Sequence, residues 1–108
     1  MNGSRPPIAQ VAVPAPLPEA LSYRVPEPLS DRLRAGMRVR VPLGRRREIG
    51  VVVGFGETVP ADVELKDVLE ALDEPEAPSL PPDLLATVLY GARHYLAPPG
   101  EMVRAALP

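Results

Sequence analysis

The sequence predicts a small α+β fold, in which a mostly antiparallel β-sheet or partly closed barrel precedes a C-terminal amphipathic helix. Apolar and polar residues alternate over 37–55, the period of a half-buried strand, whereas the apolar residues of 83–96 recur every three or four positions, the period of a helix. With 108 residues the chain has the length of one domain. We expect a β-rich part at about 8–72, an acidic Pro-rich linker at 73–82 and the helix at about 83–97.

Two short strands are expected near the start of the chain. Residues 8–13 form a short segment rich in β-branched side chains, residues 21–25 alternate between apolar and polar, and a proline follows each segment. Between them, three prolines at every second position from 14 to 18 favour an extended, polyproline-like connection, because proline lacks the N–H donor of a central strand.

Residues 37–55 predict a β-hairpin with a basic tip. The outgoing strand has an apolar face (Met37, Val39, Val41, Leu43) and a basic face that contains Arg38 and Arg40, and the tip is expected at Gly44-Arg45-Arg46-Arg47. In the returning strand one face is expected to carry Ile49, Val51, Val53 and Phe55, and the other Gly50, Val52, Gly54 and Gly56.

Residues 65–72 fit two structures. Their leucines and valine follow the helical i, i+3, i+4, i+7 pattern, and helix propensity agrees, but eight residues is also a strand length. The later helix has clearer limits, because Pro82 suits a first turn, Asp83 suits the positive end of the helix dipole and Pro98 ends the pattern. Residues 100–106 allow one further helical turn.

Charge is distributed unevenly along the chain, although the formal net charge is only −2. Residues 24–47 hold eight arginines and two acids, a local charge of +6, whereas residues 48–83 hold ten acids and Lys66, a local charge of −9. This asymmetry predicts a basic side and an acidic side. Arginine, which suits phosphate, makes up eleven of the twelve cations; a bias of the genome toward arginine codons explains that ratio equally well, but not the clustering.

Catalytic chemistry has little support in the sequence. The chain has no cysteine and one histidine, His94, and it lacks both a phosphate-binding Gly-Lys-Ser/Thr loop and a serine in a nucleophile elbow. We therefore expect no catalytic site, no cofactor and no metal. The longest apolar runs fall far short of the ~18 residues of a membrane span, and the first residues lack a signal peptide's apolar stretch, so we expect a cytoplasmic protein without a membrane partner.

The arginine-rich hairpin is the main functional signal. Phosphate contacts are expected from Arg38, Arg40, Arg45, Arg46 and Arg47 on the β-surface. The chain has only one Phe and three Tyr, which argues against a long groove that stacks many bases and favours a compact site for one nucleotide or a strand end. The alternative is a protein-interaction module that uses the acidic 57–76 flank or the Pro-rich opening, with the arginines merely solvated.

Several segments, in order, resemble the start of the PriA family of bacterial replication-restart helicases. They are Val-Ala-Val-Pro-Ala-Pro-Leu-Pro (11–18), the short strand around Tyr23, Ala-Gly-Met-Arg-Val-Arg-Val-Pro-Leu-Gly (35–44), Ile-Gly-Val-Val-Val (49–53), Glu-Leu-Lys (64–66) and Pro-Pro-Gly-Glu-Met-Val-Arg-Ala-Ala-Leu-Pro (98–108). The resemblance covers nearly the whole chain, but the helicase lobes and cysteine zinc motifs of the family are missing from it.

This resemblance implies a module that recognises the 3′-OH end of the nascent leading strand at a stalled or repaired fork, so that the expected partner is forked DNA. It also implies contacts of the full-length protein with other primosome or single-strand-binding proteins, and a nucleoid location. Carried over by position, the pocket for the DNA 3′ end consists of Leu21, Ser22, Gly44 and Lys66. Leu21 and Ser22 depart from the aromatic and acidic residues of the family pattern. The resemblance further implies a strand, not a helix, at 65–72.

Overall fold

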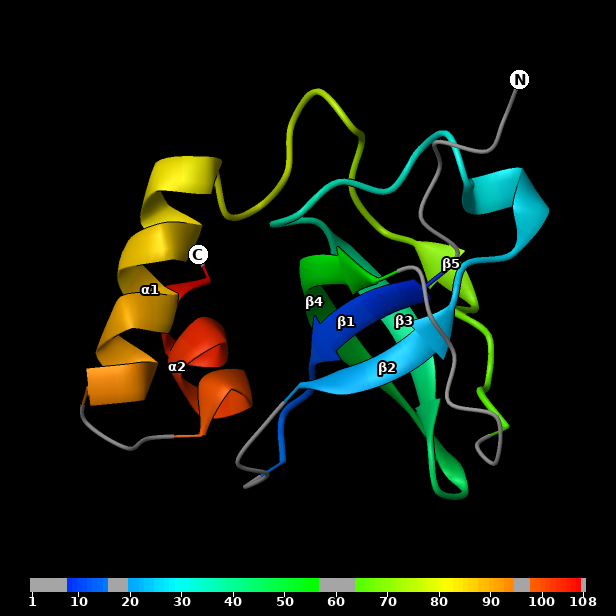
Figure 1. Cartoon of the computed structure of the whole chain (residues 1–108), viewed down its shortest axis with the longest axis horizontal. Coiled ribbons are helices and arrows are strands. Elements are labelled where there is room, and N and C mark those ends of the chain that lie inside the picture. Colours follow the sequence, from blue (N-terminus) through cyan, green and yellow to red (C-terminus); the bar gives the residue numbers. More distant parts are fainter. Residues whose placement is uncertain (1–7, 16–19, 57–63, 95–97, 108) are drawn as a thin grey trace.

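The computed structural model describes residues 8–15, 20–56, 64–94 and 98–107. Its order of elements is β1 (Ile8–Ala12), β2 (Leu21–Arg24), the 3-10 helix η1 (Glu27–Leu29), β3 (Arg38–Leu43), β4 (Arg46–Gly56), β5 (Glu70–Ala71), α1 (Pro82–His94) and α2 (Pro99–Ala106). The strands form one antiparallel sheet in the order β2-β1-β4-β3-β5, and the two helices pack together beside it (Figure 1). The predicted α+β class is confirmed, and α2 extends the single turn expected at 100–106.

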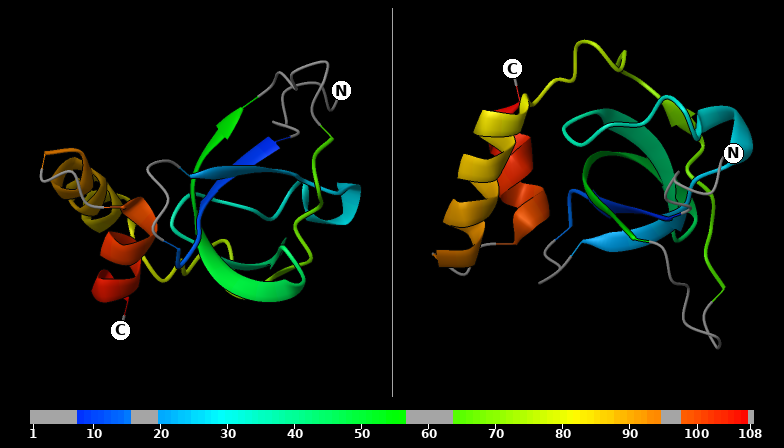
Figure 2. Two further views of the ribbon diagram at one scale, coloured as in Figure 1. Left: turned by 90° about the horizontal axis from the view of Figure 1, so that it is seen from below. Right: turned by 45° about the horizontal axis from the view of Figure 1, so that its top comes forward.

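The sheet curls strongly but does not close into a barrel (Figure 2). Residues 66–72 run between its two edges. At one edge the Arg24 amide donates to the Lys66 carbonyl over 2.8 Å and the Val68 amide donates to the Arg24 carbonyl over 2.9 Å. At the other edge the Leu69 amide donates to the Arg40 carbonyl over 2.8 Å.

Residues 65–72 are extended, so the helix favoured by their periodicity is wrong. The backbone groups of this segment bond to β2 and β3 instead of to one another, and Val68 is 1% exposed in the core. Tertiary pairing thus overrides the local helix propensity. The strand that the family resemblance implied is present only as the two residues of β5.

The β3–β4 hairpin was predicted correctly in outline, but its turn is tighter than expected. Leu43 pairs with Arg46, which leaves only Gly44 and Arg45 in the turn, and Arg46 and Arg47 belong to β4. Gly44 has a φ of +62°, in the left-handed region that two-residue hairpin turns require and that glycine adopts without strain. The turn therefore presents three consecutive arginines at the end of the hairpin.

Strand β4 differs from the simple alternation that the sequence predicts. Val51 and Val52 are both buried, at 1% and 0% exposed, because β4 lies between two hydrophobic clusters, while Ile49 is 43% exposed. A register shift against β1 leaves Val53 as an extra residue, since Gln10 pairs with Gly54 and Val11 with Val52. This bulge reverses the alternation, so that Val52 and Phe55 contact the same cluster.

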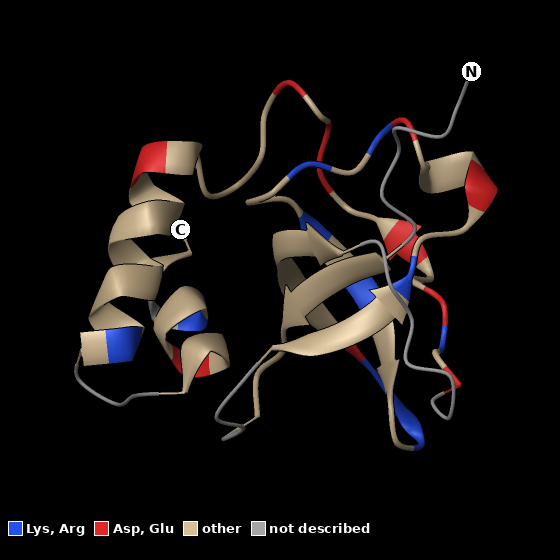
Figure 3. Ribbon diagram, viewed as in Figure 1, with Lys and Arg blue, Asp and Glu red and all other residues tan. Residues whose placement is uncertain are grey.

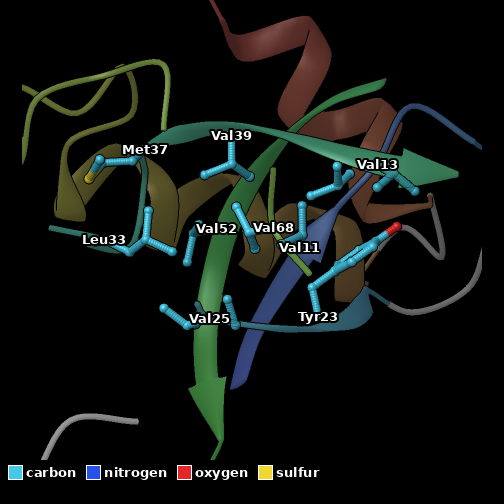
Figure 4. Close-up of a cluster of buried hydrophobic side chains, with 11 residues drawn as sticks. Val11, Val13, Tyr23, Val25, Leu33, Met37, Val39, Val52 and Val68 are labelled. Atoms are coloured by element: carbon cyan, nitrogen blue, oxygen red, sulfur yellow. The ribbon is translucent and has the colours of Figure 1, made fainter. Parts of the chain in front are cut away.

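The larger cluster fills the inside of the curled sheet (Figure 4). It includes Val11, Tyr23, Val39, Val52 and Val68, which come from separate segments of the chain. Because the inward face of β3 is occupied by this core, Arg38 and Arg40 lie on its outer face, as the alternation predicted.

The smaller cluster joins the helices to the outer side of the sheet. Val51 of β4, Leu85 of α1 and Val103 of α2 meet there. Helix α2 approaches β1 closely at Gly100, where any side chain would collide with the Val13 carbonyl oxygen. The position of α2 against the sheet is therefore fixed by backbone contact. Residues 95–97 of the predicted helix and the prolines at 16 and 18 lie outside the described residues.

Candidate nucleic-acid interface

The four residues predicted for the 3′-end pocket line one pocket of about 380 Å³. They come from three places: Leu21 and Ser22 from β2, Gly44 from the hairpin turn, and Lys66 from the segment that joins the sheet edges. The other lining residues are Tyr23, Pro42, Leu43, Glu64 and Leu65. The volume lies near the lower end of the range for small-molecule pockets, which suits a single small group better than several.

Tyr23 fixes one side of this pocket. It is only 4% exposed, and its hydroxyl donates to the Pro42 carbonyl oxygen over 2.7 Å, which ties β2 to the end of β3. Burial raises the pKa of the Tyr23 hydroxyl, so it remains a protonated donor at neutral pH. Leu21 is half-buried against the same core and also lines the pocket.

The polar groups of the pocket are accessible. Ser22, Glu64 and Lys66 are all exposed. Asp67 and Glu70 follow Lys66 closely in the sequence, but Asp67 lies 4.0 Å from Arg24 and Glu70 lies 2.9 Å from Arg40. Among the described residues Lys66 forms no ion pair. Its ammonium group is therefore available to a ligand.

Gly44 leaves the rim of the pocket open. A Cβ atom built there would meet no heavy atom within 4 Å, so the glycine is required by its positive φ and not by crowding. Its backbone is accordingly open to close approach by a ligand.

The predicted phosphate-contacting arginines lie on the other side of the hairpin. Arg38, Arg40, Arg46 and Arg47 line a hollow of about 650 Å³ between the hairpin and α2, and this hollow shares no lining residue with the smaller pocket. Arg45 lines neither one and stands exposed in the turn. The structure thus brings four of the five predicted arginines together and sets the fifth at the tip.

The uneven charge along the sequence predicted a basic side and an acidic side, but the two segments lie close together in the fold (Figure 3). Among the described residues five ion pairs join them: Arg24 to Asp67, Arg32 to Glu74, Arg38 to Asp73, Arg40 to Glu70 and Arg46 to Glu48. Four of the five acids lie in residues 67–74, which connect the two edges of the sheet. Much of the local charge of both segments is therefore neutralised within the fold.

Asp73 makes the most enclosed of these pairs. Its side chain is 5% exposed and accepts from the Arg38 guanidinium over 2.9 and 3.1 Å, from the Arg38 amide over 2.8 Å and from the Ser79 amide over 2.9 Å. Burial alone would raise the pKa of this carboxyl, but the Arg38 and Ser79 hydrogen bonds outweigh it, and the pKa is lowered. Arg38 therefore has a structural partner that holds it in place.

Arg45 and Arg47 contrast with Arg38. Both are exposed, and within the described segments neither forms an ion pair. Arg46 reaches Glu48 over 3.4 Å with 71% of its side chain still exposed. The tip of the hairpin thus keeps positive charge that no described residue neutralises.

Two side chains that reasoning from the sequence missed complete the site. Glu64 lines the small pocket; its membership in the Glu-Leu-Lys segment was the available signal, but only the lysine was assigned. Arg104 of α2 lines the larger hollow, and no local pattern marks it, because only the docking of α2 brings it to β4.

The described part of the chain holds neither a metal-binding cluster nor a membrane-spanning helix. No three His, Asp or Glu side chains gather there as a metal site would require. None of the helices there is long and apolar enough to cross a membrane.

Comparison with known proteins places the chain in a family. Residues 10–108 match the model of the 3′ DNA-binding domain of PriA. The chain is 37% identical over 103 residues to the replication restart protein PriA of Haemophilus influenzae, and 35% identical over 92 residues to a probable replication restart protein PriA of Deinococcus radiodurans. These alignments cover 94% and 84% of this chain, but only 13% and 10% of the relatives. The chain belongs to the PriA 3′ DNA-binding domain family.

Proposed function

We propose that this DNA-binding domain recognises the 3′-OH end of the nascent leading strand at stalled or repaired forks, and so positions a PriA-like protein for replication restart. The observation that carries the proposal is the small pocket on which Leu21, Ser22, Gly44 and Lys66 converge. Residues distant in the sequence meet there beside a hairpin tip whose Arg45 and Arg47 form no ion pair with any described residue. A strand end needs both features, a pocket for its last nucleotide and cations for its phosphates.

The terminal nucleotide would lie between apolar walls and polar groups. Leu21, Leu43 and Leu65 offer apolar surface to the base and sugar. Leu21 lacks an aromatic ring, and with it the ~1–3 kcal/mol that stacking contributes per base. This pocket therefore depends on shape and hydrogen bonding more than on stacking.

Recognition of the hydroxyl is assigned to Ser22 and Glu64. The Ser22 hydroxyl offers a neutral acceptor, whereas the Glu64 carboxylate offers a charge-assisted one, which is roughly twice as strong. A carboxylate accepts from a 3′-OH but repels a 3′-phosphate. Lys66 carries the opposite charge and is suited to the phosphate that precedes the terminal sugar.

The hairpin supplies the phosphate contacts. Arg45, Arg46 and Arg47 are exposed at its end and would make the main contacts. Arg38 and Arg40 keep 41% and 36% of their side chains exposed, but their carboxylate partners reduce what they would add. Three to four contacts to single-stranded phosphates give a slope of log affinity against log salt of about −2 to −3. Contacts of a full-length protein with other primosome or single-strand-binding proteins, and its location on the nucleoid, belong to the same proposal.

Fluorescence anisotropy on forks tests the proposal. The leading-strand 3′ end carries either a hydroxyl or a phosphate, and each fork is titrated at several salt concentrations. Loss of the pocket's hydrogen bond together with crowding should cost ~1–3 kcal/mol, a weakening of about 5- to 150-fold for the phosphate. Equal affinities that fall steeply with salt would contradict end recognition. Absence of DNA binding at any salt would favour the protein-interaction alternative.

A further inference from the structure

The larger hollow remains only partly explained by strand-end recognition. It lies between the outer face of the β3–β4 hairpin and α2, and its lining includes five arginines: Arg38, Arg40, Arg46, Arg47 and Arg104. One of them, Arg104, comes from a helix that contributes nothing to the small pocket. Like charges gathered in one hollow repel each other unless an anion joins them.

The charge balance within the hollow singles out two side chains. Arg38, Arg40 and Arg46 already face Asp73, Glu70 and Glu48 respectively. Arg47 and Arg104 form no ion pair with any described residue, and both are exposed. The hollow therefore presents two unneutralised guanidinium groups, one from β4 and one from α2.

The fold holds these two groups in a defined relation. Val103, next to Arg104, is 2% exposed in the smaller core cluster, and Gly100 sets α2 against the backbone of Val13. Arg47 pairs across the hairpin with Pro42, within the regular part of the ladder. Since rigid elements carry both, their side chains start from fixed points on two walls of one hollow.

We propose that this hollow is a second DNA-binding site, which holds a phosphodiester segment away from the 3′ end between Arg47 and Arg104. Arginine favours phosphate because its planar fork donates two parallel hydrogen bonds. The inference rests on the DNA-binding role of the domain, but not on the small pocket, which shares no lining residue with the hollow. Arg47 serves both proposals as a phosphate contact, whereas Arg104 serves this one alone. The backbone of a duplex arm can thus bind while the small pocket is empty.

The test uses a closed dumbbell duplex, which has no strand end, and the variant Arg104→Glu of the 108-residue chain. The matched control is Arg93→Glu, because Arg93 is also exposed and lies in the last turn of a helix, but lines neither hollow. Both variants change the net charge and the helix-end charge equally. Circular dichroism melting verifies that each variant folds, and Arg104→Gln removes the attraction without adding repulsion.

Arg104→Glu should weaken dumbbell binding about tenfold and reduce the salt slope by about 1, Arg104→Gln should have a smaller effect, and Arg93→Glu should stay within twofold of the unmodified chain. The ratio of affinities for 3′-OH and 3′-phosphate forks should not change in Arg104→Glu.

Equal binding of the dumbbell by Arg104→Glu and Arg93→Glu would refute the second site. That result is expected if the hollow binds an acidic protein surface instead of DNA. Displacement of the dumbbell by millimolar inorganic phosphate would instead indicate a site for free anions. Failure of strand-end recognition would appear separately, as equal binding of the two forks by the unmodified chain.

Discussion

At the base of the β3–β4 hairpin, Arg38 and Arg40 face carboxylates from the 70–73 segment, whereas at its tip Arg45 and Arg47 face solvent. All four belong to one short hairpin and have the same side chain. The base arginines hold the 70–73 segment to the sheet, and the tip arginines keep their charge unneutralised. The difference shows that the position of an arginine relative to the acidic segment decides its role, which a count of arginines does not reveal.

The base and the tip of the hairpin also differ in their hydrogen bonds. Asp73 draws Arg38 into a buried cluster that also satisfies the amide of Ser79. A turn of two residues, by contrast, keeps the tip short, and Arg45 and Arg47 pair with none of residues 67–74. The side chains at the base are thus held by interactions within the fold, whereas those at the tip stay exposed.

Reversal of the tip charges should have the largest effect. In the double variant Arg45→Glu/Arg47→Glu two attractive phosphate contacts become repulsive, so fork affinity should fall about 100-fold at low salt. Stability should change by less than about 0.5 kcal/mol, because both residues are exposed and unpaired among the described residues. Fork anisotropy and urea denaturation measure the two quantities.

The control for net charge is Arg34→Glu/Arg93→Glu, which changes the charge equally at exposed positions that line neither hollow. Because the Arg34 guanidinium donates to the Asp31 and Leu33 carbonyl oxygens, only the affinity of this control, and not its stability, is compared. It should retain affinity within a few-fold. If both double variants lose affinity equally, DNA responds to overall charge and the tip has no special role.

Removal of the carboxylate at the base should instead affect stability. Asp73→Ala leaves the amides of Arg38 and Ser79 without their acceptor and takes away the partner of the Arg38 guanidinium. We expect a loss of about 2 kcal/mol in the free energy of unfolding, measured by urea denaturation. Glu74→Ala is the control, because its pair with Arg32 is exposed on both sides and should contribute less than about 1 kcal/mol. Equal losses in the two variants would contradict the structural role of the base.

The sequence predicted the elements whose signals are local. Alternation over 37–43 identified β3 and its outward arginines, and the helical period of 83–96 identified α1. The sequence-based prediction failed where residues distant in the sequence determine the local structure. Residues 65–72 have a helical period, but their backbone forms hydrogen bonds with Arg24 and Arg40. The bulge at Val53 likewise arises from pairing with β1, so the burial of both Val51 and Val52 could not be read from alternation.

In the candidate site, too, some residues were predictable from the sequence and others depend on tertiary packing. The resemblance to PriA identified four residues that the structure brings to one pocket, although which of them contact DNA stays a prediction. The ion pairs of Arg38 and Arg40 were not predictable, because they depend on the path of residues 66–73 between the sheet edges. Arg104 was missed for the same reason, since only the packing of α2 on β1 and β4 brings it near the hairpin.

Low pH should weaken the interactions of Asp73 at the base of the β3–β4 hairpin, and it should have no direct effect on the arginines at the hairpin tip. Because the folded state lowers the pKa of Asp73, its contribution to stability is fully present above the unfolded carboxyl pKa of about 4 and is lost as the pH falls through the lower folded value. The difference in unfolding free energy between the unmodified chain and Asp73→Ala should therefore shrink below pH 4. Urea denaturation at several pH values measures it, and a difference that stays constant down to pH 3 would contradict the lowered pKa.

The smallest expected effect comes from Arg40, which lies at the base but keeps 36% of its side chain exposed. Its 2.9 Å pair with Glu70 is solvent-accessible, so Arg40→Gln should cost less than about 1 kcal/mol in stability. Because Glu70 already neutralises this guanidinium, fork affinity should fall less than twofold. Arg47→Gln removes the same charge from the tip and should weaken fork binding severalfold without a change in the urea midpoint. A larger loss of affinity in Arg40→Gln than in Arg47→Gln would mean that DNA displaces Glu70, and that the base contributes to binding as well as to the fold.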